Sequence, residues 1–205
     1  AYRASVPLEQ LIDFYLDEGE AQGVAGDIAF AQSVLETGWF GFTGSVVEPA
    51  DNNFAGIGAN GMPGHVAEFP TARIGVRAQI QHLWAYAHPA AHADGTARPL
   101  VDPRFDLVTP KGKAPTWEQM GAGAWAVDQD YGPKVLALYN DLLEVSRIRR
   151  WVGDAYHDVL DRSAGANERD WWLSPTETRG RTWVARTLSR SHEGISALIR
   201  ERHGQ

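Results

Sequence analysis

The stretch Gly26-Asp-Ile-Ala-Phe-Ala-Gln-Ser-Val-Leu-Glu-Thr-Gly38 decides the fold that we predict for this chain of 205 residues. Apolar side chains occur on nearly every side of it, which is typical of a helix buried at the centre of a domain. Its polar exceptions, Gln32, Ser33 and Glu36, are spaced three and four residues apart and share one face. Gly38 is a typical residue for the end of a helix, so the sequence places Glu36 in the last turn.

This pattern indicates a catalytic role for Glu36. A carboxylate there faces the negative end of the helix dipole, an arrangement that costs about 0.3–1 kcal/mol when exposed. Apolar neighbours add desolvation, and both effects raise the pKa of a carboxyl group. A raised pKa suits a general acid, which must hold its proton near neutral pH. The plain alternative is a solvated glutamate at a helix end.

Length and composition limit the size of the core and exclude some kinds of protein and of catalytic group. With 43% hydrophobic residues, the chain can form one sizeable core, or one domain and a small appendage. The mean hydropathy is -0.33 and no apolar run approaches membrane-spanning length, so we expect no membrane span. The first residues lack a charged segment followed by an apolar one, so we expect no signal peptide within this sequence. The absence of cysteine excludes disulfides and thiol nucleophiles.

The segments around the central stretch predict more helices and one hairpin. Residues 7–19, residues 71–88 and a segment beginning near Pro133 carry apolar side chains at helical spacing. Turn signals between short apolar pieces predict a small β-hairpin at about residues 52–70. The expected apolar face of the first helix consists of Leu8, Leu11, Ile12, Tyr15 and Leu16.

The distribution of charge divides the chain. Residues 1–145 carry 8 Lys and Arg against 18 Asp and Glu, whereas residues 146–205 carry 11 Arg, no Lys and 8 acidic residues. We therefore predict two domains, residues 1–148 and a small all-helical domain at residues 149–205.

Three motifs in order resemble the glucosaminidase family of peptidoglycan hydrolases, glycoside hydrolase family 73. They are the segments 31–38, 52–57 and 125–131, and the resemblance covers roughly residues 5–145. It implies a mainly α, lysozyme-like fold with a small β-hairpin lobe, which cleaves β-1,4 bonds of cell-wall glycan. It also implies that Glu36 is the general acid and that Tyr131 is a tyrosine of the cleft.

The second group of the reaction stays open. Many relatives carry a second carboxylate in a longer hairpin lobe, whereas here the lobe holds only Glu68, and Glu48 and Asp51 precede it. One of these acids could activate water, the 2-acetamido group of the substrate could attack with Tyr131 steadying it, or water could react with little help. No second acid is well placed by sequence, which favours the acetamido or water route.

Substrate binding is predicted in the loop after the central helix and at tryptophans. Asn53 and the backbone of Phe54 to Gly58, which includes Gly56, would bind sugar amides and hydroxyls, since glycine lets a ligand approach the backbone closely. Ordinary turn formation is the alternative for Asn53. Aromatic rings also serve as stacking platforms for sugars, with core packing as the alternative. The candidate platforms are Trp39, Trp84 and Trp125.

No metal and no other cofactor is expected. Pro89 interrupts any helix that would align His88 with His92, and no glycine-rich phosphate loop follows a strand.

The C-terminal segment faintly resembles a small helical repeat of secreted bacterial proteins, through Asp158-Val-Leu-Asp-Arg162 and the pair Trp171-Trp172. Its arginines could bind anionic wall polymers, whereas the plain alternative is a helical appendage with its own core. We expect no nucleic acid as partner, because acidic residues interrupt the positive charge.

The sequence therefore predicts a secreted or cell-wall endo-β-N-acetylglucosaminidase, from a bacterium or a phage, with peptidoglycan strands as its partner. An N-acetylmuramidase, a lytic transglycosylase and a non-catalytic glycan-binding module are the alternatives.

Overall fold

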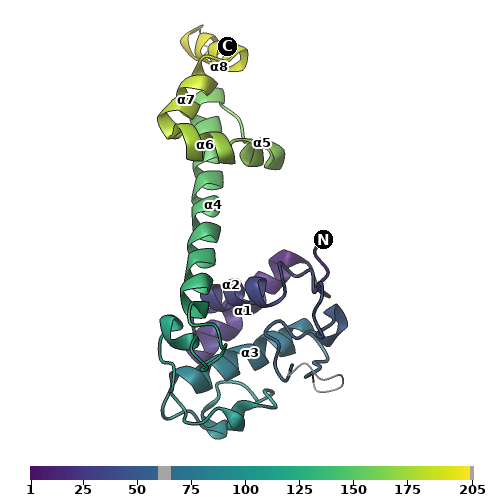
Figure 1. The fold of residues 1–205 in the computed structure, drawn as a ribbon. Helices are drawn as coiled ribbons and strands as arrows, with labels where there is room; N and C mark the ends of the chain where they lie inside the picture. The colour runs from purple at the N-terminus through teal and green to yellow at the C-terminus, as the bar shows by residue number, and fades with distance from the viewer. Residues whose placement is uncertain (60–65, 204–205) are drawn as a thin grey trace. The chain divides into compact units, whose positions relative to one another are not determined.

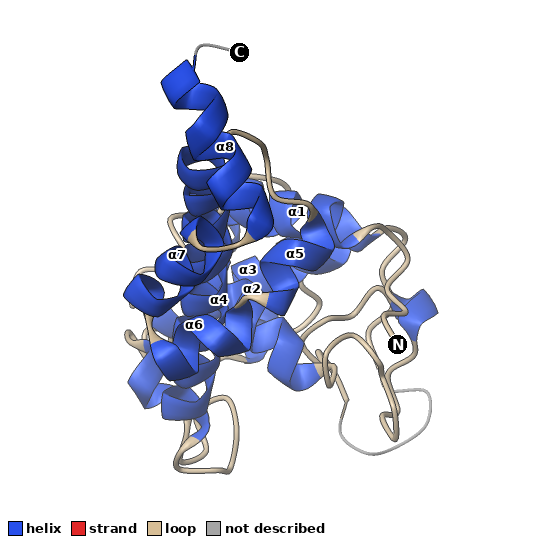
Figure 2. Cartoon of the chain, turned by 90° about the horizontal axis from the view of Figure 1, so that it is seen from above, coloured by secondary structure: helices blue, strands red, loops and turns tan. Residues whose placement is uncertain are grey.

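The computed structural model describes residues 1–59 and 66–203, and in this part every regular element is a helix (Figures 1 and 2). The predicted mainly α fold is confirmed. The α-helices are α1 (Leu8–Gln22), α2 (Gly26–Glu36), α3 (Ala72–Ala87), α4 (Tyr131–Leu160), α5 (Ala166–Trp171), α6 (Leu173–Arg179), α7 (Arg181–Ser189) and α8 (His192–His203). Short 3-10 helices are η1 (Pro49–Asp51), η2 (Ala93–Gly95), η3 (Phe105–Leu107) and η4 (Trp117–Met120).

The turn of the predicted hairpin, residues 60–65, lies outside the described residues. Its described flanks are loop rather than strand. The Ala67 N–H donates to the Ile57 carbonyl at 3.0 Å, and the Phe69 N–H donates to the Asp51 carbonyl at 2.8 Å. These bonds hold the two flanks together without a regular ladder in the described part.

The chain forms two compact units, residues 1–139 and residues 140–205. The sequence places the division at residues 148 and 149, which lie inside α4. The helix expected to begin near Pro133 continues into the predicted second domain as the single helix α4. Residues 144–150 contain no proline or glycine that would end the helix there.

In the first unit, α1 packs against both α2 and α3. The closest approach of α1 and α2 needs glycine, because a Cβ at Gly26 would lie 2.1 Å from the Tyr15 carbonyl oxygen. The buried residues of α1 are Leu11, Tyr15, Glu18 and Gly19.

The predicted apolar face of α1 is right at Leu11 and Tyr15 and wrong at Leu8 and Leu16. The latter two side chains are 39% and 47% exposed. The core of the first unit includes Leu11, Tyr15, Ala29, Val34, Phe40, Phe54, Val76, Ile80, Leu83, Phe105 and Val135.

The second unit has its own apolar core, built around α4 and the short helices that follow. Trp172 is buried there, and its indole N–H donates to the Tyr156 hydroxyl at 2.9 Å. Arg162, just past α4, binds Glu168 of α5 and Glu193 of α8. Among the described helices of both units, none is long and apolar enough to cross a membrane.

Candidate active site

The end of α2 sets the position of Glu36. Glu36 is the last residue of the helix, and Gly38 has a left-handed φ of 57°. The Trp39 N–H donates to the Val34 carbonyl at 2.8 Å, and the Gly38 N–H donates to the Leu35 carbonyl at 3.3 Å. This pair of bonds is the Schellman ending that a glycine at this position predicts. It stops the helix one residue after the carboxylate and leaves that carboxylate at the negative end of the helix dipole.

The chain continues through three bulky residues in a backbone conformation that such residues rarely adopt. Trp39, Phe40 and Phe42 have φ values of 60°, 56° and 53°. Phe40 and Phe42 are buried in the core, whereas Trp39 is 64% exposed. The strained segment therefore presents one large aromatic ring to solvent, three residues after Glu36.

Glu36 is partly buried, and two donors share one of its carboxylate oxygens. The indole N–H of Trp125 donates to Oε1 at 3.0 Å, and the hydroxyl of Tyr131 donates to the same oxygen. Tyr131 is the first residue of α4 and is buried. The other oxygen, Oε2, faces the loop after η1, since a Cβ at Gly56 would lie 3.9 Å from it.

Burial raises the pKa of the Glu36 carboxyl above its ordinary value, and the bonds from Tyr131 and Trp125 offset part of this rise. The pKa of Tyr131 is also raised, first by burial and then by the neighbouring Glu36 charge, so its hydroxyl stays protonated. The site thus holds a carboxyl group that keeps its proton to a higher pH than an exposed glutamate, as a general acid requires.

The raised pKa predicts that Glu36→Gln stabilises the folded protein near pH 7. A charged Glu36 is disfavoured in the folded state, whereas the glutamine amide is neutral and its oxygen can accept the same two bonds. The gain, about 1 kcal/mol, should be absent below the ordinary carboxyl pKa of 4.5, where the group is neutral in both states. It should appear as the pH rises through 4.5 and be complete above the folded-state pKa. Thermal unfolding of both proteins at pH 4 and pH 7 measures it, and an equal difference in melting temperature at the two values would contradict it.

Asn53 and Phe54, the other binding residues predicted in the loop after η1, are both engaged with the protein itself. Asn53 is buried, and its side-chain amide bonds backbone groups of residues 55, 57 and 67 at 2.8–3.4 Å. Phe54 is buried in the core against Phe40. In this geometry Asn53 shapes the loop, and the backbone near Gly56 is the part that faces Glu36.

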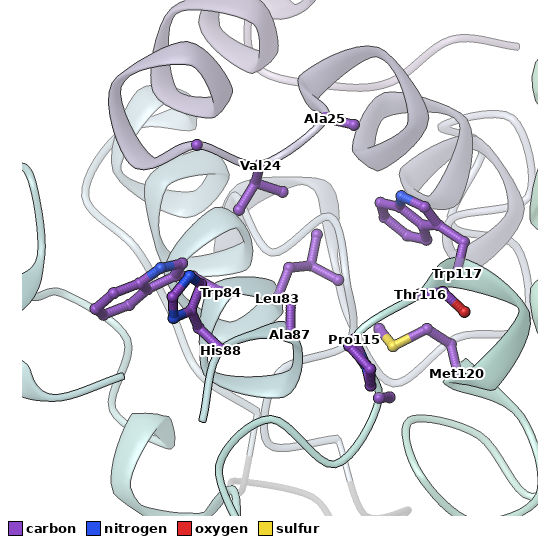
Figure 3. A pocket seen from close by; sticks show the side chains of 12 residues that line it. Val24, Ala25, Leu83, Trp84, Ala87, His88, Pro115, Thr116, Trp117 and Met120 are labelled. Carbon is purple, nitrogen blue, oxygen red and sulfur yellow. The ribbon is translucent and has the colours of Figure 1, made fainter. Parts of the chain in front are cut away.

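Trp84 lies apart from the Glu36 cluster. Its ring stacks on Phe105, with 6.0 Å between the ring centroids, and lies beside His88. Figure 3 shows this ring and His88 on one side of a pocket, with Trp117 and Met120 on the other. The pocket measures about 160 Å³ and its lining includes neither Glu36 nor Tyr131.

None of the three acids considered for the second catalytic role is bonded to Glu36 in the described structure. Glu68 and Glu48 are exposed. The Asp51 carboxylate accepts a hydrogen bond from the Glu48 N–H at 2.7 Å, which caps η1. Within the part of the chain that the structure describes, no group of three or more histidine or acidic side chains could hold a metal ion.

The structure also places around Glu36 residues for which no role was predicted. Gln32 lies one turn before Glu36 and donates to the Tyr131 hydroxyl at 3.0 Å. The His82 ring lies edge-on to Trp125 at 5.3 Å, and His82 itself binds the buried Asp102 at 2.7 Å. The shared face of Gln32 and Glu36 was visible in their spacing, whereas the His82–Asp102 pair joins residues twenty positions apart and left no local signal.

Comparisons with known proteins support the resemblance seen in the motifs. The family model "Glucosaminidase: Mannosyl-glycoprotein endo-beta-N-acetylglucosaminidase" matches residues 12–144. The chain is also similar to an uncharacterized protein of Borreliella burgdorferi, with 38% identity over 136 residues. That alignment covers 66% of this chain and 63% of the relative, so the chain spans just under two thirds of the relative's length. No solved structure matches the chain.

Proposed function

Since the chain belongs to the Glucosaminidase family, we propose that it is an endo-β-N-acetylglucosaminidase that hydrolyses β-1,4 bonds in the glycan strands of bacterial peptidoglycan. The observation that carries this proposal is the environment of Glu36. Its carboxyl group has a raised pKa, one oxygen held by two donors and the other oxygen facing a glycine-containing loop.

In the proposed reaction, Glu36 donates its proton to the oxygen of the leaving sugar. Negative charge then develops on the carboxylate, and the bonds from Tyr131 and Trp125 stabilise it because both donors are already in place. For the second role we propose the acetamido group of the substrate or a water molecule, because Glu48, Asp51 and Glu68 are not well placed by sequence and the Asp51 carboxylate caps η1. A product with cleanly inverted anomeric configuration would exclude acetamido participation.

The bond that is cut can be determined from the new reducing ends. Purified cell walls are digested with the protein, the products are reduced with borohydride, and the fragments are analysed by mass spectrometry. Fragments with reduced N-acetylglucosamine ends support the proposal. Reduced muramic acid ends would show an N-acetylmuramidase, and anhydro ends would show a lytic transglycosylase. Release of nothing from several wall types, with binding that survives Glu36→Ala, would show a glycan-binding module.

The exposed ring of Trp39 is the proposed stacking platform for a sugar near Glu36. Trp39→Ala should raise KM about tenfold and leave kcat within a factor of two or so, because the ring would bind substrate and transition state equally. Kinetics on soluble glycan fragments measure both constants. Trp171→Ala is the matched control, because that ring is 65% exposed in the second unit. An unchanged KM in Trp39→Ala would remove Trp39 from the binding site.

The proposed substrate places the protein at the cell wall, whether a bacterium or a phage supplies it. Anionic wall polymers are the proposed partner of the arginines in residues 149–205. Two of these side chains are engaged within the second unit: Arg149 binds Asp170 at 2.8 Å, and Arg162 binds Glu168 at 2.7 Å. Binding of the full chain to walls with and without these polymers would test the proposal.

A further inference from the structure

Behind Glu36, a line of buried hydrogen bonds runs through the core of the first unit. The Tyr15 hydroxyl on α1 donates to Oε1 of Gln79 on α3 at 2.6 Å. Nε2 of Gln79 donates to Oε1 of Gln32 on α2 at 2.9 Å, and Nε2 of Gln32 donates to the Tyr131 hydroxyl at 3.0 Å. Tyr131 then donates to Oε1 of Glu36. Tyr15, Gln32 and Gln79 are fully buried, so water does not compete for these bonds.

The direction of this line follows from one backbone group. Nε2 of Gln79 lies 3.2 Å from the carbonyl oxygen of Ala29, which can only accept a hydrogen bond. A flipped Gln79 amide would place two oxygens against each other, so its nitrogen must face Ala29 and Gln32. Gln32 therefore presents its oxygen to Gln79 and its nitrogen to Tyr131.

The direction of these hydrogen bonds determines that the Tyr131 hydroxyl donates to Glu36. Its hydroxyl oxygen accepts from Gln32, so its single proton is directed to Oε1 of Glu36. Oε1 also accepts from the indole N–H of Trp125. With two donors already directed at Oε1, a proton on that oxygen would oppose them, whereas Oε2 can carry a proton without conflict.

We propose that Gln32 is a positioning residue which, with Gln79 and Tyr15, keeps the Tyr131 hydroxyl as a donor to Oε1 of Glu36, so that Oε2 carries the proton given to the substrate. The transfer of this proton to a substrate rests on the proposed function. The location of the proton on Oε2 does not. Oε2 is the oxygen that faces the loop at Gly56. Bonds in a line polarise one another, so Gln32 also strengthens the bond from Tyr131 to Glu36.

Gln32→Met tests the proposal, because methionine has a similar size and no donor. Without the bond from Gln32, Tyr131 donates more weakly and can turn its proton away from Glu36. The pKa of the Glu36 carboxyl should therefore rise further, and the alkaline limb of the kcat profile should move to higher pH. Since the acid proton is then shared between both oxygens, Oε2 carries it only part of the time, and kcat should fall by a factor of about two or more with KM unchanged.

Gln81→Met is the matched control. Gln81 lies on α3 and, like Gln32, is buried. Its amide forms hydrogen bonds with backbone groups of residues 98–102 and takes no part in the hydrogen bonds that lead to Glu36. A loss of packing alone would affect both variants in the same way. Only Gln32→Met should move the alkaline limb.

Carbon-13 NMR of the Glu36 carboxyl, in the 205-residue chain labelled at glutamate and assigned by Glu36→Gln, gives a measure independent of turnover. The titration in Gln32→Met should shift to higher pH than in wild type. Tyr15 and Tyr131 have raised pKa values and stay neutral through this titration, and His82 with Asp102 lies beyond the Trp125 ring. If wild type hydrolyses nothing, the proposed function fails, yet this titration still decides the role of Gln32.

Tyr15→Phe is the second variant, since it keeps the ring that packs against Phe30 and removes only the first donor of the line. It should shift the Glu36 titration in the same direction by a smaller amount. A titration in Gln32→Met or in Tyr15→Phe that matches wild type, or a shift of equal size in Gln81→Met, would overturn the proposal.

Discussion

Replacing Glu36 with glutamine should lower the rate of wall hydrolysis by a factor of about 10²–10⁴. Glutamine keeps the shape of the side chain and can accept the bonds from Tyr131 and Trp125, but it has no proton to give to the leaving oxygen. The loss should appear in kcat, because the proton is transferred only in the transition state. Reducing ends released per unit time from purified walls measure the rate.

Glu68→Gln is the matched control for this experiment, because Glu68 is exposed and lies in the lobe where the family resemblance suggests a second carboxylate. On the acetamido or water route it should keep activity close to that of wild type. Equal losses in both variants would show that Glu68 is the second catalytic group. If Glu36→Gln retains more than about a tenth of the activity, Glu36 is not the acid.

Replacing Glu18 with alanine should produce a large loss of stability in the first unit. The Glu18 side chain is 2% exposed and binds Arg73 at 2.8 Å, Arg77 at 3.0 Å and Arg98 at 2.8 Å. Removal of the buried acid leaves Arg77 and Arg98 without this counter-charge and leaves Arg73 with its exposed partner Asp17. The expected cost is about 3–5 kcal/mol, the usual cost of breaking a buried ion pair. Urea unfolding of the full chain, with hydrogen exchange in α1 and α3, measures it.

Glu20→Ala is the control, because Glu20 lies on the same helix and is exposed. It should change the free energy of unfolding by no more than about 0.5 kcal/mol. Similar effects of the two substitutions would mean that the ion pairs around Glu18 contribute little to the stability of this unit.

Much of the first unit could be predicted because its signals are local. The apolar stretch up to Gly38 predicts a buried helix that ends beside Glu36, and α2 ends at Glu36. Thr116 and Gln119 have the spacing of a capping box, and the structure forms one at the start of η4. The direction of the pKa shift of Glu36 was also predicted, but its cause is burial, which was expected only as an addition to the effect of the helix dipole.

The remaining features depend on contacts between distant segments. Glu18 looks like a solvated residue near a helix end, and its three arginines come from α3 and from the loop that follows it. The donors to Glu36 come from residues 125 and 131, so spacing within α2 could not identify them. Family resemblance pointed to Tyr131 and motif position pointed to Trp125, whereas Gln79 and Tyr15 had no signal beyond their apolar surroundings.

The carbonyl oxygen of Ala29 has a consequence for how such a site can change through evolution. It sets the direction of the hydrogen bonds that lead to Glu36, and it belongs to the main chain rather than to a side chain. Every amino acid supplies the same oxygen at position 29, so no single codon change can remove it. Mutation there is limited instead by volume, since Ala29 is completely buried. The direction of these hydrogen bonds therefore depends on the path of the backbone, whereas the strength of each bond depends on the side chains that form it.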